Sequence, residues 1–166
     1  PSTVCAHNAT TTLKIPLPDT LFNIVWKDAG GTILGTGSNL VVTPTTTTTY
    51  TVEIIYSLCD GTSLVETNYT TVTVKGSKIW DGSENTDWNN TNNWTPAGVP
   101  TADECIVISN VANDPIVSGT SYDALGLNLT IENGAVLTVN STNDIIINDW
   151  VNINAGGDLQ LNDSSS

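Results

Sequence analysis

Over residues 1–76, hydrophobic and polar positions alternate in short runs that are separated by turn residues. The runs at 22–27 and 49–58 show the pattern most clearly, because nearly every second side chain is large and apolar. A period of two is that of a strand with one buried face. The first run places Trp26 on such a face, and Asp60-Gly61 is a typical turn. About seven such strands, roughly 8–12 residues apart, predict a β-sandwich.

The C-terminal part of the chain, residues 103–166, repeats itself. Residues 129–140 read LTIENGAVLTVN and residues 151–162 read VNINAGGDLQLN, so that apolar positions, a glycine and the final asparagine coincide. A shift back by the same 22 residues places Val107 under Leu129, and Pro115 and Val117 under Leu137 and Val139, with poorer agreement between them. Strand, Asn/Gly turn and strand at a spacing of about 20 residues predict the rungs of a β-solenoid. So few rungs bury too little apolar surface to be stable alone. We therefore expect the pattern to continue in a longer protein.

Between the two patterns lies a segment, residues 77–102, that has neither period. It contains Trp80, Trp88 and Trp94 within a run of Asn, Asp, Thr and Gly. These turn-forming residues bond to their own backbone and disfavour a helix. Three indoles, in contrast, bury a large apolar area. We therefore expect a structured loop region that caps the solenoid.

The charge of the chain excludes several partners. It carries 17 acidic and 4 basic residues, all four of them lysines, and a net charge of −13. Binding to nucleic acid or to an anionic membrane needs clustered Lys and Arg, so neither is expected. No apolar run approaches the roughly 20 residues of a membrane span, so membrane insertion is not expected either. The acidity is typical of an extracellular surface and allows divalent cations to bind.

The three cysteines indicate an oxidising compartment. A bond between Cys5 and Cys59 would close a loop of about 55 residues and contribute roughly 4 kcal/mol by the loop-entropy model. It would tie the first strand of the sandwich to the end of the penultimate strand. Cys105 lies in the apolar run 105–108, and we expect it to be a buried structural thiol. No base or helix terminus that would activate it is visible.

The sequence lacks the signatures of an enzyme. His7 is the only histidine, and no Gly-x-Ser-x-Gly, Cys/His pair or phosphate loop occurs. Asp103 and Glu104 are neighbouring carboxylates, but a solvated turn explains them. We expect no catalytic residue and no catalytic cofactor in this chain.

Two motifs in the Trp-rich segment suggest ligands. Asp81, Ser83, Asn85 and Asp87 alternate oxygen side chains as at the start of a calcium loop. The alternative is a network of Asx turns, which we favour because the glycine and the bidentate glutamate of an EF-hand are out of place.

The second motif is aromatic. Trp88 and Trp94, with the asparagines around them, would form a carbohydrate platform if their indole faces were exposed. The alternative is that these indoles seal the end of the solenoid core, and we favour it.

The string W-D-G…W…N-W-x-x-x-x-V-P, from Trp80 to Pro100, precedes the pattern L-x-L-x-I-x-x-G-A-x-L-x-V at 127–139. Together these residues resemble a module of very large secreted surface proteins of the Bacteroidota. Many of those proteins are exported by the type IX system, and the module opens a right-handed parallel β-helix there. The "LGTG" at 34–37 and the "TTTYTV" at 47–52, between two cysteines, resemble the Ig-like or PKD-like modules of the same proteins.

The resemblance, first to gliding-motility adhesins, implies an all-β chain in three parts. These are an Ig-like β-sandwich at 1–76, a Trp-rich cap at 77–102 and a truncated right-handed parallel β-helix at 103–166. The expected function is that of a non-catalytic structural and adhesive segment at the bacterial cell surface. Its partners would be neighbouring domains of a longer chain and surface polysaccharide. The alternatives are a carbohydrate-binding module using Trp88 and Trp94, and an accessory region of a secreted polysaccharide-degrading enzyme.

Overall fold

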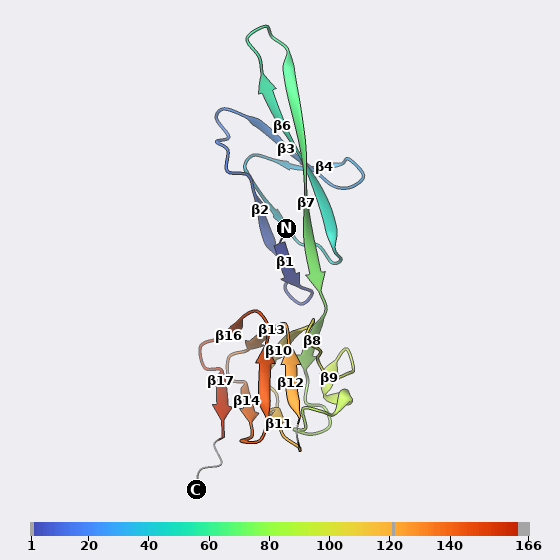
Figure 1. Ribbon diagram of the computed structural model, residues 1–166, viewed down its shortest axis with the longest axis vertical. Helices are drawn as coiled ribbons and strands as arrows, with labels where there is room; N and C mark the ends of the chain where they lie inside the picture. Colours follow the sequence, from blue (N-terminus) through green and yellow to red (C-terminus); the bar gives the residue numbers. More distant parts are fainter. Residues whose placement is uncertain (1, 121, 163–166) are drawn as a thin grey trace. The chain divides into compact units, whose positions relative to one another are not determined.

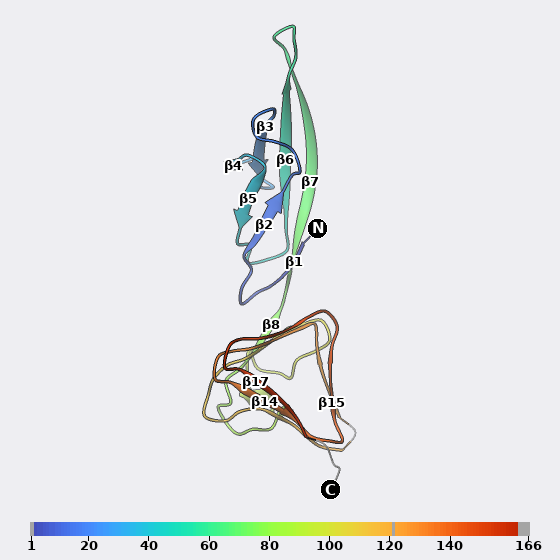
Figure 2. The ribbon, with the colours of Figure 1, turned by 90° about the vertical axis from the view of Figure 1, so that its left-hand side faces the viewer.

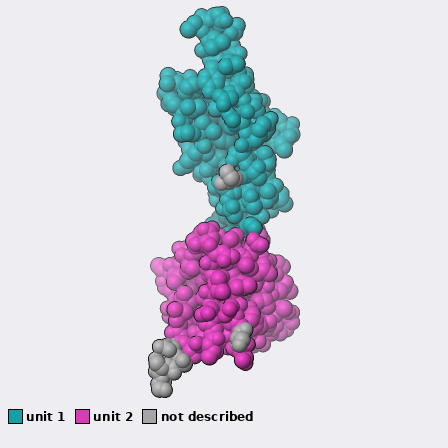
Figure 3. Space-filling view, viewed as in Figure 1, with its two compact units in different colours: residues 1–75 teal, residues 76–166 magenta. Residues whose placement is uncertain are grey.

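The computed structural model describes residues 2–120 and 122–162, and it is mostly β-structure. Its ribbon is shown in Figure 1. The only helical segment in this part of the chain is the short 3-10 turn Thr91–Asn93, and no helix there is long and apolar enough to cross a membrane. The all-β prediction is therefore confirmed. The chain divides into two compact units, Pro1–Lys75 and Gly76–Ser166 (Figure 3).

Unit 1 consists of two sheets. Its strands are β1 (Ser2–Cys5), β2 (Thr11–Lys14), β3 (Asn23–Lys27), β4 (Ile33–Thr36), β5 (Asn39–Val42), β6 (Thr48–Ser57) and β7 (Ser63–Lys75). The larger sheet has the order β1-β7-β6-β3-β4, and β2 pairs with β5 in the smaller one. Only the β1–β7 pair is parallel among the pairs of these two sheets.

One core joins the two sheets of unit 1. Ile24 and Trp26 on β3 are each 1% exposed, and Val52 on β6 belongs to the same cluster. Leu13 on β2 and Val42 on β5 join it from the smaller sheet. The alternation at 22–27 and 49–58 therefore identifies the buried faces, because period two assigns successive side chains to opposite faces.

Unit 2 is built from three sheets of mostly parallel strands. Its strands are β8 (Ser77–Trp80), β9 (Trp94–Thr95), β10 (Cys105–Ile108), β11 (Ile116–Val117), β12 (Asp123–Gly126), β13 (Asn128–Ile131), β14 (Val136–Val139), β15 (Asp144–Ile147), β16 (Val151–Ile153) and β17 (Asp158–Leu161). The sheet orders are β16-β13-β10-β8-β9, β11-β14-β17 and β12-β15, and only β8 and β9 pair antiparallel. In Figure 2 the chain of unit 2 passes repeatedly around one three-sided outline.

The predicted offset of 22 residues holds in the last two turns of unit 2. Leu129 pairs with Val151 in β13–β16, and Val139 pairs with Leu161 in β14–β17. One turn earlier the offset of 22 holds for Val117, which lies opposite Val139, but the placement of Val107 is wrong by one residue, since Leu129 lies opposite Ile106. All four residues of β10 are buried, so this strand shows no alternation from which its phase could be read.

The apolar column of unit 2 is covered within the stack but open at its last turn. Leu129 and Ile131 are 0% exposed, whereas their partners Val151 and Ile153 are 48% and 45% exposed. Leu161 is 71% exposed, although its partner Val139 is 4% exposed. The difference arises because only the earlier turn has a parallel neighbour on both sides.

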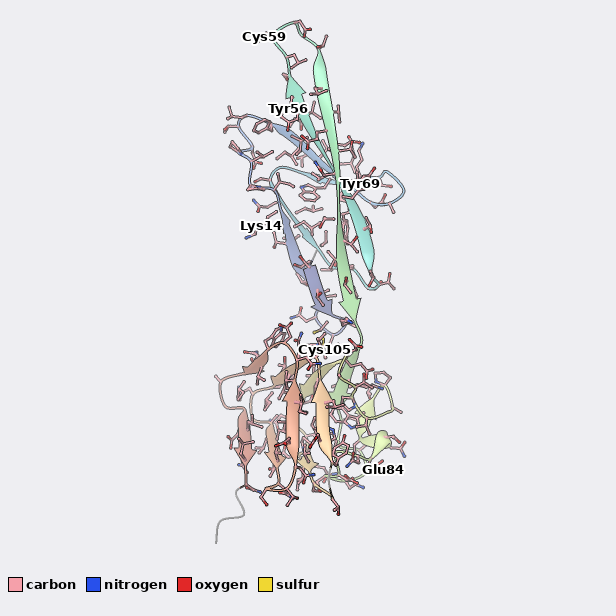
Figure 4. All side chains as sticks on the ribbon, viewed as in Figure 1. Lys14, Tyr56, Cys59, Tyr69, Glu84 and Cys105 are labelled. Atoms are coloured by element: carbon pink, nitrogen blue, oxygen red, sulfur yellow. The ribbon has the colours of Figure 1, made fainter. Side chains whose placement is uncertain are left out.

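The predicted disulfide between Cys5 and Cys59 is wrong. Cys5 and Cys105 are the disulfide-bonded cysteines, and Cys59 is free and exposed. Cys59 lies at the turn between β6 and β7 (Figure 4), whereas Cys5 pairs with Lys75 at the far end of β7. Twelve strand steps of about 3.3 Å separate these ends, roughly 40 Å, and a disulfide needs Cα atoms within about 7 Å. Cys105 is therefore not the free structural thiol that we expected.

The bonding of the cysteines predicts how many thiols react in the unfolded chain. Without reductant, an alkylating reagent in denaturant should modify one cysteine, Cys59, and after reduction it should modify all three. Cys59→Ser should abolish the first signal and leave two modified residues after reduction. Mass spectrometry of the alkylated chain checks this, and modification of Cys105 before reduction would contradict the bonding.

The open last turn predicts unequal costs for the same substitution at paired positions. Ile131→Ala should lower the free energy of unfolding by about 2–5 kcal/mol, as expected for a buried isoleucine. Ile153→Ala, at the paired position, should cost less than about 1 kcal/mol, because that residue is already 45% exposed. Denaturant titration of the two variants measures the difference. Equal costs would mean that the last turn is covered in solution.

Candidate functional site

Three indoles form the first layer of the core of unit 2. Trp80, Trp88 and Trp94 are 0%, 0% and 2% exposed. The rings of Trp80 and Trp94 meet edge to face at 5.0 Å and 81°, and those of Trp88 and Trp94 at 4.8 Å and 78°. Their cluster includes Ile106 and Leu137 of the parallel strands. The indoles thus seal one end of the apolar column.

The Trp-rich segment also adds hydrogen-bonded partners to two sheets at that end. β8 and β9 stand at the edge opposite β16, and Trp80 pairs with Trp94 across them. Asp87 forms a parallel bridge with Ile116 of β11, where Trp88 N donates to Ile116 O at 3.2 Å. The segment therefore satisfies backbone groups that a first turn would otherwise leave unpaired.

Asn93 is the polar centre of the segment. Its side chain is buried, with 0% exposure, and its Oδ1 accepts hydrogen bonds from Glu84 N at 2.9 Å and Asn85 N at 3.1 Å. Its Nδ2 donates to Asn85 Oδ1 at 2.8 Å and to Asp87 O at 3.0 Å. Two bonds accepted and two donated satisfy the whole carboxamide. Asn93 therefore closes the loop 84–87 over the indoles without leaving a polar atom of its own side chain unpaired.

A glycine allows the chain to turn at Trp80-Asp81-Gly82. Gly82 has φ of 55°, and a Cβ there would lie 2.5 Å from Asn113 O and 2.9 Å from Trp80 Nε1. Asn113 holds this turn from the other side, because its O accepts from Trp80 Nε1 at 2.7 Å and its Nδ2 donates to Gly82 O at 2.7 Å. Asp81 N and Gly82 N donate to Asn93 O at 2.9 and 3.3 Å. The W-D-G motif is therefore explained by the conformation and the contacts that this turn requires.

The outer side of the segment carries an exposed carboxylate network. Glu84 accepts from Asn90 Nδ2 at 2.8 Å and from Asn92 Nδ2 at 2.9 Å, and these bonds lower the pKa of Glu84. Figure 4 labels Glu84 on this side of unit 2. A hydrogen bond from the Thr95 hydroxyl, at 2.5 Å, is the main reason that the pKa of Asp81 is lowered. Both groups stay ionised and engaged with neighbouring residues.

Three of the four candidate calcium ligands form Asx turns, and the fourth, Ser83, donates its hydroxyl to Asn92 O at 2.7 Å. Asp81 Oδ1 accepts from Ser83 N at 3.0 Å, Asn85 Oδ1 from Asp87 N at 2.9 Å, and Asp87 Oδ1 from Asn89 N at 3.0 Å. Each oxygen thus bonds the backbone two residues on, which is the geometry of an Asx turn. Among residues 2–120 and 122–162, no group of three or more His, Cys, Asp or Glu is placed to hold a metal ion. The hydrogen bonds of the Asx network that we favoured are therefore present in the structure.

Trp88 and Trp94 do not form a carbohydrate platform; they are buried in the core of unit 2, as in the alternative that we favoured. Stacking on a sugar needs an exposed indole face, and Trp88 and Trp94 present none. Trp94 Nε1 donates inward to Trp88 O at 3.0 Å. The segment has no period from which the direction of each indole could be read, and burial was favoured because three indoles carry a large apolar area.

Two further residues of the site have no signal in the sequence. Asn93 stands in a run with Asn89, Asn90 and Asn92, and nothing in the run marks it as the buried one. Lys78 is 8% exposed, and its Nζ donates to the carbonyls of residues 96 and 97 at 3.0 and 2.9 Å. Both hold loops of the segment in place.

The chain belongs to a family described as a domain of unknown function (DUF8693), whose model matches residues 79–166. The matched span includes the Trp-rich segment and the parallel strands together. No curated protein and no solved structure shows a significant match to the chain.

The role of Asn93 predicts a large loss of stability when its carboxamide is replaced by a carboxylate of nearly the same size. Asn93→Asp should lower the free energy of unfolding by about 3 kcal/mol or more, because it buries a carboxylate against Asn85 Oδ1 and Asp87 O. Asn89→Asp is the matched control, and it should cost less than about 1 kcal/mol. Thermal and denaturant unfolding measure both variants. Equal stability of the two would contradict the central place of Asn93.

Proposed function

We propose that this chain is a non-catalytic structural and adhesive segment of a large extracellular bacterial surface protein, of the gliding-motility adhesin type. In this proposal unit 1 is an Ig-like sandwich and unit 2 opens a right-handed parallel β-helix. The observation that carries the proposal is the parallel stacking of unit 2, sealed by indoles at one end and uncovered at the other.

The stacking supports a β-helix in three ways. Each successive turn of the chain adds a parallel strand to the same three sheets, and the apolar positions of successive turns lie in register. Asn162 Nδ2 donates to Asn140 Oδ1 at 3.2 Å, which continues the stack at a corner. Gly134 and Gly156, at another corner, have φ of 80° and 86°. A repeated turn with conserved corner geometry within the chain is the unit of a solenoid.

The uncovered turn supports a segment of a larger assembly. Val151, Ile153 and Leu161 expose apolar area where the equivalent residues one turn earlier are buried. A neighbouring domain that adds a turn would bury them and would pair the free backbone groups of β15, β16 and β17. A stiff rod of this kind projects or presents a binding surface.

A disulfide and a net charge of −13 support an extracellular location. Disulfides persist in oxidising compartments, and an acidic surface keeps a secreted protein soluble. The carboxylates of the Trp-rich segment are engaged with their own loop, which supports a structural role for it.

The proposed location can be tested with Cys59, which is free and exposed. A membrane-impermeant maleimide should label the parent protein on intact cells that produce it, and Cys59→Ser should abolish this labelling. Mass spectrometry of the labelled peptide measures the result. Labelling that requires cell lysis would overturn the extracellular assignment.

The adhesive role is tested in the same cells. Deletion of residues 1–166 in frame should reduce attachment of the cells to a polysaccharide surface, while an epitope tag elsewhere in the parent protein shows unchanged surface display. Unchanged attachment at unchanged display would leave a spacer and reject adhesion.

A further inference from the structure

The disulfide divides the chain into the residues that it encloses and the residues outside it. It joins Cys5, in β1 of unit 1, to Cys105, the first residue of β10 in unit 2. Residues 6–104 are therefore enclosed in a covalent loop, which contains the strands β2 to β9. Covalent connectivity alone makes this division. It holds for any arrangement of the two units, and whatever residues precede or follow the chain.

Both cysteines are strand partners of residues at the junction between the two units. Within unit 1, Cys5 is paired with Lys75 in the parallel pair of β1 and β7. Within unit 2, Cys105 is paired with Ser77 in the parallel pair of β10 and β8, and Cys105 N donates to Gly76 O at 2.8 Å. The disulfide is thus a second covalent connection between the units, in addition to the peptide junction at Gly76.

The core of unit 1 and the indoles of unit 2 belong to the enclosed loop. The buried residues of the unit 1 cluster run from Leu13 to Val72, and Trp80, Trp88 and Trp94 follow them before the second cysteine. The strands β10 to β17 begin at Cys105 and lie outside the loop. The bond therefore separates unit 1 and the Trp-rich segment from the remaining turns of the parallel stack.

This connectivity decides which residues carry tension along the chain. Tension is carried by the shortest covalent path between the points where it is applied. In a longer protein it enters before Cys5 and leaves after Cys105, and the path through the disulfide consists of two side chains. The path through residues 6–104 stays slack, because a disulfide holds its ends with Cα atoms within about 7 Å of each other. Tension does no work on a slack segment and does not favour its unfolding.

We propose that the disulfide between Cys5 and Cys105 is a load bypass, which carries tension past unit 1 and the Trp-rich segment into the strands from β10 onward. The inference rests on the proposed function, since a surface segment that attaches a cell to a substrate is under such tension. Unit 1 then keeps its native surface while the chain outside the loop is extended. Without the bond, the same tension would pass through unit 1 from β1 to β7, its first and last strands.

The first test stretches the oxidised chain between handles at its two termini and repeats the measurement after reduction with a dithiol. In the oxidised chain, only the residues before Cys5 and after Cys105 should extend. Reduction should add the loop 6–104, about 100 residues or roughly 330 Å of extended chain. Cys105→Ser should give the longer extension without reductant, whereas Cys59→Ser, the matched control, should behave as the wild-type chain. Single-molecule force spectroscopy measures these lengths, and far-UV circular dichroism checks that both variants are folded.

The second test applies the load inside the loop, through a handle on Cys59, which is free and exposed. Tension between this handle and the C-terminus should unfold unit 1 although the disulfide is intact. The additional extension should correspond to residues 60–104, about 45 residues or roughly 150 Å. This geometry shows that unit 1 yields to tension when it is loaded, so that its resistance between the termini comes from the bypass.

Two results would overturn the proposal. One is release of the enclosed loop when the oxidised chain is stretched by its termini, and the other is a reduced chain that gains no length. Neither measurement uses a cell or a ligand. Failure of the bypass is therefore distinguishable from failure of the adhesive role, which the attachment assay tests.

Discussion

Unit 2 depends on the closure of its apolar column. Parallel turns bury side chains only between one another, so a stack is stable in its interior and exposed at each end. At the first end Trp80, Trp88 and Trp94 supply the apolar area that a preceding turn would supply. At the last end Ile153 and Leu161 have no such cover. The sealed first end, more than the interior, distinguishes this unit from an indefinite repeat.

Sealing the column with a loop creates a second requirement, because a loop brings backbone groups that no ladder pairs. The asparagines and aspartates meet it locally. In each Asx turn a side-chain oxygen accepts a hydrogen bond from the backbone N–H two residues later. The buried side chain of Asn93 accepts from two backbone N–H groups, and donates to one carbonyl, of the loop that covers the indoles. The same side chains that resemble ligands for calcium or sugar are therefore needed to let three indoles be buried.

Most of the fold follows from period and spacing. Alternation at 22–27 and 49–58 predicts strands and their buried faces, and the 22-residue offset predicts the register of 129–139 with 151–161. The prediction fails where a pattern carries no phase. The run 105–108 is apolar throughout, and the register predicted for it was therefore wrong by one residue. Cysteine pairing failed because it depends on which strand ends meet, and strand order is not contained in local alternation.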